Sequence, residues 1–181
     1  MALKATICKA QIQLSDMDRH YYETLNLTIA QHPSETNQRM MVRLMAFLLN
    51  AHEHLQFTKG LSSDEEPELW QINLTDEIEV WIDLGLPEER RIRKACSRSK
   101  EVIIYAYGGT AVAQWWQRTQ SKVSRFDHLK VYNMPQDTVE ALVQLVSRNM
   151  SFQCTIQDGE VWLTDDESSE SVTFAPELIK G

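Results

Sequence analysis

The chain has 181 residues, of which 43% are hydrophobic and 24% charged, which is typical of a folded globular protein and excludes the disordered and fibrous classes. It contains 18 lysine and arginine residues against 26 aspartate and glutamate residues, and the formal net charge of −8 argues against strong, sequence-blind binding to DNA. The longest nearly apolar run, residues 40–49, is interrupted by Arg43 and is shorter than the roughly 20 residues that a membrane span needs.

The sequence contains no secretory signal, cysteine pair or nucleotide-binding motif, and these absences set our expectations for the compartment and the cofactors. The first residues carry no apolar block of a secretory signal, so we expect a soluble cytoplasmic protein without a membrane partner. The three cysteines, Cys8, Cys96 and Cys154, form no CxxC pair, so neither disulfides nor a cysteine-rich zinc site is expected. Neither GxGxxG nor a P-loop occurs, so we expect no organic cofactor. We further expect a monomer.

An N-terminal hairpin is predicted from residues 3–14 and 22–31. Both stretches contain β-branched residues in partial alternation, and residues 15–18 between them are typical of a turn. In the second stretch, alternation places three apolar residues on one face: Leu25, Leu27 and Ile29.

A buried helix is predicted from residue 34 to about residue 51. Pro33 ends the preceding strand, and Ser34 is the expected N-cap. Apolar residues then repeat at the spacing of one helical face: Met41, Leu44, Met45 and Leu48. Glu35 lies in the first turn of this helix, where a favourable interaction with the helix dipole is its simplest role.

Strands and helices alternate through the rest of the chain. The expected strands are 55–58, 69–73, 78–84, 101–107 and 129–133, and the expected helices are 87–99, 110–120 and 136–147. Such alternation is typical of a parallel or mixed central sheet with crossover helices. At the C-terminus, strands 151–157, 160–164 and 172–174 are expected to form a β-meander, with Asp158-Gly159 as a hairpin turn. We therefore predict a single α/β (α+β) domain over residues 1–181.

Asp83 is the first candidate site residue. It follows Glu79 and Trp81 on the polar face of strand 78–84, at the strand end, where α/β sheets place ligands. Mg²⁺ takes oxygen ligands, usually one or two carboxylates with waters and phosphate oxygens. Asp83 could bind it together with one or two of Glu35, Glu68 and Glu79. The alternative is an exposed carboxylate on a solvated sheet face.

The helix at 87–99 is the second candidate. Its packing face contains Ile92, Ala95, Cys96 and Ser99, and a cationic stripe contains Arg90, Arg91, Lys94 and Arg98. A stripe of this kind beside a metal would suit a phosphodiester, whose transition state gains negative charge. The alternative is a solvated face with the ion pairs Glu89–Arg93 and Glu88–Arg91.

Two further motifs favour structural roles. Gly108-Gly109-Thr110 could hold an anion at a helix N-terminus, but a tight turn with Thr110 as N-cap is the favoured interpretation. Trp115 and Trp116 precede Arg118 and could stack on bases, but tryptophans of an amphipathic helix are more often core residues.

Several blocks of the sequence resemble the YaeQ family of bacterial proteins, and the resemblance spans essentially the whole chain. The matching blocks are MALKATI-K at the start, HPSET-RMM-RL at 32–44, LQFTKGL at 55–61, EPE-W at 66–70, WIDLGLPEERRI-KAC at 81–96, QWW and QSK within 114–122, and TIQDG at 155–159. The family is similar to PD-(D/E)XK nucleases. The resemblance therefore implies a restriction-endonuclease-like fold, a mixed central sheet flanked by helices, with its nuclease-like core at about 34–107.

The resemblance also implies a set of metal ligands. The superfamily positions that gather Mg²⁺ correspond to Glu35, to Glu68 after Pro67, and to Asp83. Asp64 and Glu66 are alternatives for the second acidic position, because the surrounding loop is rich in carboxylates. Gly85 stands where the superfamily has a lysine, so the cation would come from the following helix, through Arg91 or Lys94. Arg91 is closer, about 6 Å along the helix axis against about 10 Å for Lys94.

Two function hypotheses follow from the residues and the resemblance together. The first is a Mg²⁺-dependent nuclease-like phosphodiesterase, with Glu35, Asp83, Arg91 and Lys94 as catalytic residues and with nucleic acid bound through the local basic helix. The second is a catalytically inactive binding or regulatory protein on the same fold, linked by the resemblance to transcription elongation. The missing strand lysine and the net charge of −8 motivate the second hypothesis.

Overall fold

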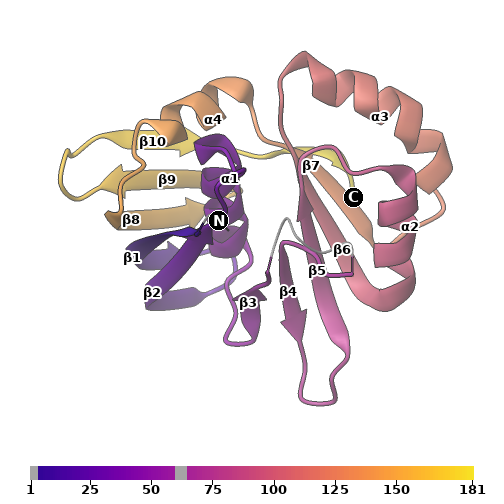
Figure 1. Cartoon of the computed structure of the whole chain (residues 1–181), viewed down its shortest axis with the longest axis horizontal. Helices are drawn as coiled ribbons and strands as arrows, with labels where there is room; N and C mark the ends of the chain where they lie inside the picture. The colour runs from indigo at the N-terminus through magenta and orange to yellow at the C-terminus, as the bar shows by residue number, and fades with distance from the viewer. Residues whose placement is uncertain (1–3, 60–64) are drawn as a thin grey trace. The chain divides into compact units, whose positions relative to one another are not determined.

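The structure is a computed structural model that describes residues 4–59 and 65–181 (Figure 1). The chain forms two compact units, one from residues up to Leu49 together with Asp137–Pro176 and the other from Asn50–Gln136 together with Glu177–Gly181. The described residues contain two mixed sheets and four helices, which confirms a mixed α+β protein. The strand–helix alternation forms a mixed sheet as predicted, whereas the N-terminal hairpin and the C-terminal meander pair with each other in a second sheet, which was not predicted.

The first unit is built on a five-stranded sheet of order β10-β9-β8-β1-β2. Its strands are β1 (Thr6–Asp16), β2 (Tyr21–Gln31), β8 (Asn149–Gln157), β9 (Glu160–Asp165) and β10 (Ser171–Phe174). β1 pairs with β2 antiparallel, as the predicted hairpin requires, and with β8 in parallel. The parallel pair brings together strands far apart in the sequence, with Lys9 opposite Asn149.

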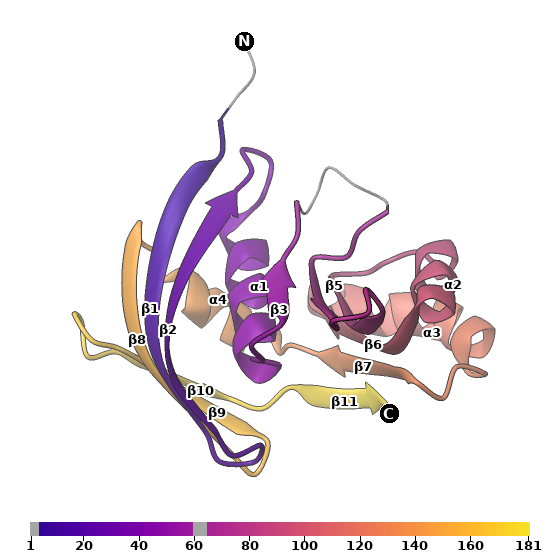
Figure 2. The ribbon, with the colours of Figure 1, turned by 90° about the horizontal axis from the view of Figure 1, so that it is seen from below.

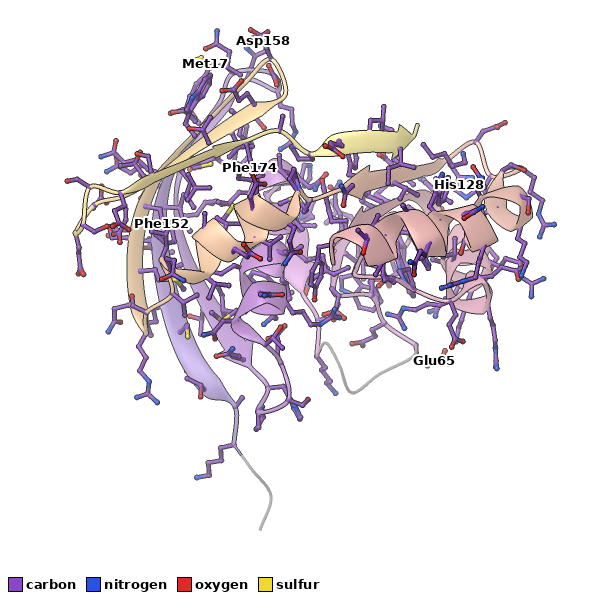
Figure 3. All side chains as sticks on the ribbon, turned by 90° about the horizontal axis from the view of Figure 1, so that it is seen from above. Met17, Glu65, His128, Phe152, Asp158 and Phe174 are labelled. Carbon is purple, nitrogen blue, oxygen red and sulfur yellow. The ribbon has the colours of Figure 1, made fainter. Side chains whose placement is uncertain are left out.

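The turns of the two hairpins are hydrogen-bonded to each other. The Asp18 carboxylate accepts the backbone N–H groups of Asp158 and Gly159 at 2.7 and 2.9 Å. Met17 and Asp158 accordingly lie at the same end of the sheet in Figure 3. Asp158 and Gly159 both have positive φ, 53° and 77°, as a two-residue turn of the predicted type requires.

Helix α1 (Asn37–Leu49) supplies the core of this unit. Its residues from Met40 to Leu48 are all buried, and the predicted apolar stripe is confirmed. Ser34 is not the N-cap that was predicted. The helix begins at Asn37, and the hydroxyl of the preceding residue, Thr36, accepts the backbone N–H of Arg39 at 3.1 Å. The second helix associated with this unit is α4 (Gln136–Val143), shorter than the predicted 136–147.

The second unit is built on a six-stranded sheet of order β11-β7-β6-β5-β4-β3. Its elements are β3 (Leu55–Phe57), β4 (Leu69–Ile72), β5 (Ile78–Leu84), α2 (Glu89–Arg98), β6 (Ser99–Ala106), α3 (Thr110–Val123), β7 (Leu129–Asn133) and β11 (Glu177–Lys180). β5, β6 and β7 are parallel neighbours, and β4 and β11 flank them antiparallel. The two strands expected at 78–84 and 129–133 have the predicted bounds.

Helices α2 and α3 cover the same face of the parallel strands, where Figures 1 and 2 show them side by side. Ile92 and Cys96 of α2 and Trp115 of α3 pack with Trp81 and Val102 in one buried cluster. Trp81 therefore lies on a covered face of β5, and the prediction that this face is polar and solvated is wrong. Trp115 is a core residue, as predicted.

The helix starts in this unit differ slightly from the prediction. The N-cap of α2 is Glu88, so Pro87 precedes the helix instead of opening it. The N-cap of α3 is Gly109, with φ 65° and ψ −128°, whereas Thr110 was expected to cap the helix. Strand β11 was not predicted. None of the helices in the described ranges is both long enough and apolar enough to cross a membrane.

Candidate functional site

Two of the predicted acidic residues, Glu68 and Asp83, come from neighbouring positions of paired strands. Glu68 directly precedes β4, and its backbone N–H donates to the carbonyl oxygen of Ile82 at 3.0 Å, one residue before Asp83. Both side chains are buried, with Glu68 4% and Asp83 3% exposed. The alternative of a solvated Asp83 is therefore wrong.

Asp83 is held by a bidentate ion pair with Arg91. The guanidinium donates from Nε to Oδ2 at 2.9 Å and from Nη2 to Oδ1 at 3.0 Å. Trp81 donates its indole Nε1–H to the same Oδ2 at 3.0 Å. Two parallel N–H···O bonds fix both the distance and the plane of the two groups, which a single contact does not. The structure thus brings the preferred of the two predicted cations to Asp83.

The turn between β5 and α2 positions Arg91, because hydrogen bonds hold the turn at Gly85 and at Pro87. Gly85 has φ 81°, in the left-handed region that favours glycine, and its N–H donates to Tyr105 O on the neighbouring strand at 2.9 Å. The carbonyl oxygen of Pro87 accepts the indole N–H of Trp115 at 2.8 Å. Gly85 therefore allows the left-handed backbone conformation that this turn needs. It occupies the position at which the resemblance implied a lysine.

Basic residues on the same side of α2 also hydrogen-bond to residues 65–66, just before Pro67. Arg91 Nη2 donates to the Glu66 carbonyl oxygen at 2.9 Å, and Arg98 Nη1 donates to the Glu65 carbonyl oxygen at 2.8 Å. Lys94 Nζ contacts Glu65 Oε1 at 2.5 Å, and this hydrogen bond lowers the pKa of the exposed Glu65 carboxyl. Lys94 is thus paired with Glu65 (labelled in Figure 3) and, among the described residues, makes no ion pair with Asp83.

Glu35 lies in the other unit, just before α1 and not in its first turn. Its carboxylate is 8% exposed and accepts a hydrogen bond from Arg43 Nη2 at 2.7 Å, with Arg39 Nε at 3.9 Å. Arg43 also donates to the carbonyl oxygen of Ala30 at 3.1 Å. A buried ion pair replaces the expected interaction with the helix dipole. That Glu35 joins Glu68 and Asp83 in one site stays a prediction.

The other acidic candidates have different surroundings. Glu79 belongs to a surface group with Lys100, at 2.9 Å, and Asn73. Asp64 lies outside the described residues. Glu66 meets Arg91 through its carbonyl oxygen and is only partly buried, whereas Glu68 is buried and its backbone pairs with Ile82, next to Asp83.

Of the two ion pairs predicted within α2, one is present. Arg93 Nε lies 3.4 Å from Glu89 Oε1, so this pair is confirmed. Arg91 pairs with Asp83 and not with Glu88. Trp81 as a partner of Asp83 was missed, although residues two apart on a strand share a face and the sequence contained that signal. Within residues 4–59 and 65–181, no group of three or more His, Cys, Asp or Glu side chains is arranged to hold a metal ion.

Comparison with known proteins identifies the family. The family model described as YaeQ protein matches residues 1–174. The protein YaeQ of Escherichia coli (strain K12) is 47% identical over 174 residues, which cover 96% of each chain, and that of Salmonella typhi is 48% identical over 91% of each.

Solved structures agree. The crystal structure of the YaeQ protein from Xanthomonas axonopodis pv. citri superposes with a TM-score of 0.93 at 46% identity, covering 98% of this chain and 99% of that one. The structure of the YaeQ protein from Pseudomonas syringae gives 0.92 at 33% identity, covering 98% and 97%. The chain belongs to the YaeQ family.

Proposed function

We propose that the chain is a Mg²⁺-dependent nuclease-like phosphodiesterase whose site is built around Asp83, Glu68 and Arg91. The observation that carries the proposal is the bidentate contact between Arg91 and the buried Asp83. It brings a permanent positive charge to a carboxylate at a strand end, in a turn that has no lysine. A PD-(D/E)XK-like fold is part of the proposal, and the element order α1, β3, β4, β5, α2, β6 supports it.

The two carboxylates fit the chemistry of a magnesium site. Mg²⁺ is usually held by one or two carboxylates together with waters and phosphate oxygens. Asp83 accepts three hydrogen bonds of the about four that a carboxylate can accept, so one acceptor direction is available. Glu68 and Asp83, both buried, would hold the ion. When bound, Mg²⁺ supplies Lewis-acid polarisation of a phosphodiester.

Arg91 then has two tasks that follow from its geometry. It orients the carboxylate of Asp83 through two parallel hydrogen bonds, and it places positive charge where a phosphodiester gains negative charge during cleavage. A guanidinium stays protonated, so Arg91 does not exchange a proton with the substrate. Lys94 can contribute as the second cation only by exchanging its contact with Glu65 for one with substrate.

Metal titration and cleavage assays test the proposal. Calorimetry with MgCl₂ or MnCl₂ is expected to give binding to the wild type and none to Asp83→Asn. Metal-dependent cleavage of DNA or RNA should fall by about 100-fold or more in Arg91→Ala, the range for removal of one group that stabilises transition-state charge. Lys130→Ala, which removes an exposed cation of β7 paired with Glu101 at 3.4 Å, is the control. Absence of metal binding in the wild type would remove the proposed first step.

A second candidate is a non-catalytic binding or regulatory protein on the same fold. It is favoured by the hydrogen bonds that already engage both oxygens of Asp83, and by the pairing of Lys94 with Glu65. On this hypothesis Asp83 and Arg91 form a structural ion pair. It predicts that the wild type cleaves neither single- nor double-stranded nucleic acid with any divalent metal, while Asp83→Asn loses stability. Cleavage that Asp83→Asn abolishes would exclude it.

A further inference from the structure

Positive charge is concentrated in one part of this acidic chain. Residues 85–128 contain 9 of the 18 lysine and arginine residues but only 4 of the 26 aspartate and glutamate residues. This stretch comprises α2, β6 and α3. The net charge of −8 therefore conceals a basic region in the second unit, and the two neighbouring helices carry most of it.

The cations of α2 divide between two sides of the helix. Arg91, Lys94 and Arg98 are engaged by Asp83 and by the chain at 65–66, so they are committed to the candidate site. The Arg90 side chain is exposed and makes no hydrogen bond or ion pair with any residue of the described ranges. Arg93 has a side chain that is 50% exposed and pairs with Glu89 at 3.4 Å. Two cations of α2 thus remain open to a partner.

Helix α3 continues this surface. Lys122 Nζ lies 3.9 Å from Glu89 Oε2, which places this flank of α3 next to α2, in agreement with Figures 1 and 2. Arg118 precedes Lys122 by four residues, so both side chains share one helix face. Arg118 is exposed and makes no ion pair with a described residue. Nearby exposed positions carry uncharged hydrogen-bonding side chains: Gln114, Gln117 and Ser121.

We propose that these four residues, Arg90, Arg93, Arg118 and Lys122, form a face that binds the phosphate backbone of a double-stranded nucleic acid. This α2–α3 basic face would hold the substrate of the proposed phosphodiesterase, so the inference rests on the proposed function. Arginine and lysine side chains with amide and hydroxyl groups are the usual contacts to phosphates, which position a duplex without reading its sequence.

The choice of duplex over single strand comes from the aromatic residues. Proteins that bind single strands stack successive bases on exposed aromatic rings. Trp115 of α3 is buried in the core. Trp116 is partly buried, packs against the same core cluster and lines a separate pocket with Ile179 and Lys180, so the four basic side chains themselves alternate with polar and not with aromatic residues. The face therefore offers charge and hydrogen bonds but no stacking surface, which suits a duplex whose bases stay paired.

Fluorescence anisotropy in EDTA tests binding separately from metal-dependent cleavage. The probes are a DNA duplex and an RNA duplex of about 20 base pairs, and a single strand with the same number of phosphates. Four phosphate contacts predict that log K falls with log[salt] with a slope of about −3 to −4. The double variant Arg90→Gln/Arg118→Gln should bind at least about 10-fold more weakly, with the slope reduced by about 2.

The control is Lys9→Gln/Lys130→Gln, which removes the same charge from exposed lysines of β1 and β7. It should bind like the wild type. Equal affinity of both double variants, tighter binding of the single strand, or displacement of the duplex by polyglutamate as readily as by unlabelled duplex would overturn the inference. Duplex binding that needs Arg90 and Arg118 but is followed by no metal-dependent cleavage would refute only the proposed activity. Cleavage undiminished in Arg90→Gln/Arg118→Gln would refute only the basic face.

Discussion

Trp81 and Asp83 lie two residues apart on β5, and the indole N–H of Trp81 donates to Asp83 Oδ2 at 3.0 Å. The ring is completely buried, and the guanidinium carbon of Arg98 lies over it at 5.5 Å from the centroid. Trp81 therefore connects the core under α2 with the carboxylate that Arg91 holds. A buried aromatic residue is one of the groups that position the candidate site.

Replacing Trp81 by Phe should separate its hydrogen bond from its packing. The smaller ring keeps most of the apolar contact but leaves Asp83 Oδ2 with one donor fewer, which is expected to destabilise the fold by about 1–3 kcal/mol. Urea unfolding followed by circular dichroism measures this change. The control is Trp162→Phe, at a partly exposed position of β9, which should change stability little. Equal stability of the two variants would show that the Trp81–Asp83 hydrogen bond contributes nothing.

The ion pair of Asp83 with Arg91 should behave as a coupled unit. Arg91→Gln leaves a buried carboxylate without its bidentate partner and should destabilise the fold by about 2–3 kcal/mol, near the lower end for broken buried pairs because Arg91 is partly exposed. In the double variant Asp83→Asn/Arg91→Gln the loss should be smaller than the sum of the two single losses. Arg93→Ala, which breaks an exposed pair, should stay within about 0.5 kcal/mol of wild type. Additive losses would indicate independent residues.

In the first unit, Glu35 and Arg43 should be coupled more strongly, since both side chains are buried. Glu35→Gln leaves the guanidinium without its carboxylate and is expected to destabilise the fold by about 3 kcal/mol. Adding Arg43→Met removes the unpaired charge, so the double variant should recover part of that loss. Further destabilisation by Arg43→Met would instead show that its contact with Ala30 O matters more than the ion pair.

Alkaline stability should depend on Cys154. Burial, and secondarily the negative charge of Asp16, raises the pKa of this thiol from 9.0 to about 12. Because the folded-state pKa is raised, the stability it contributes is complete below pH 9 and is lost as the pH rises toward 12. The unfolding free energy of the wild type should fall more steeply with pH in this window than that of Cys154→Ala, by up to about 1.4 kcal/mol per pH unit. Parallel curves would contradict the prediction.

Two glycines with positive φ should differ in their tolerance of substitution. Gly109 has φ 65° and ψ −128°, a combination almost restricted to glycine, so Gly109→Asn should destabilise the fold by about 1–3 kcal/mol. Gly159 has φ 77° in a two-residue hairpin turn, and a side chain there would meet no atom within 4 Å. Gly159→Asn should therefore change the melting temperature much less, because asparagine tolerates the left-handed region. A smaller effect at Gly109 would be the contradictory outcome.

Local patterns predicted the elements that local forces determine. The apolar spacing from Met41 to Leu48 indicated a buried helix, and the strict alternation of 78–84 gave the bounds of β5. The short strand β11 could not be found this way, because its four residues become a strand only through pairing with β7. The parallel pairing of β1 with β8 likewise depends on contacts between distant segments, so the separate five-stranded sheet was missed.

For the candidate site, chain order indicated Arg91 as the cation near Asp83, because a helix that follows a strand end brings its first turns back to that end. Burial was not predictable in the same way. Alternation assigned Trp81 and Asp83 to a polar face, and only the packing of α2 and α3 shows that this face is covered. Ser34 was preferred as N-cap by residue type, but Thr36 has the hydroxyl that the helix uses.

The parallel pairing of β1 with β8 has a consequence for how the protein is made. On the ribosome β1 emerges long before its partner, and all strands from β3 to β7 are synthesised in between. Until β8 is made, the edge of β1 that β8 will cover has unpaired backbone N–H and C=O groups. Strands with such an edge tend to associate with other chains. We expect newly made chains to depend on chaperones more than the small size of the protein would indicate.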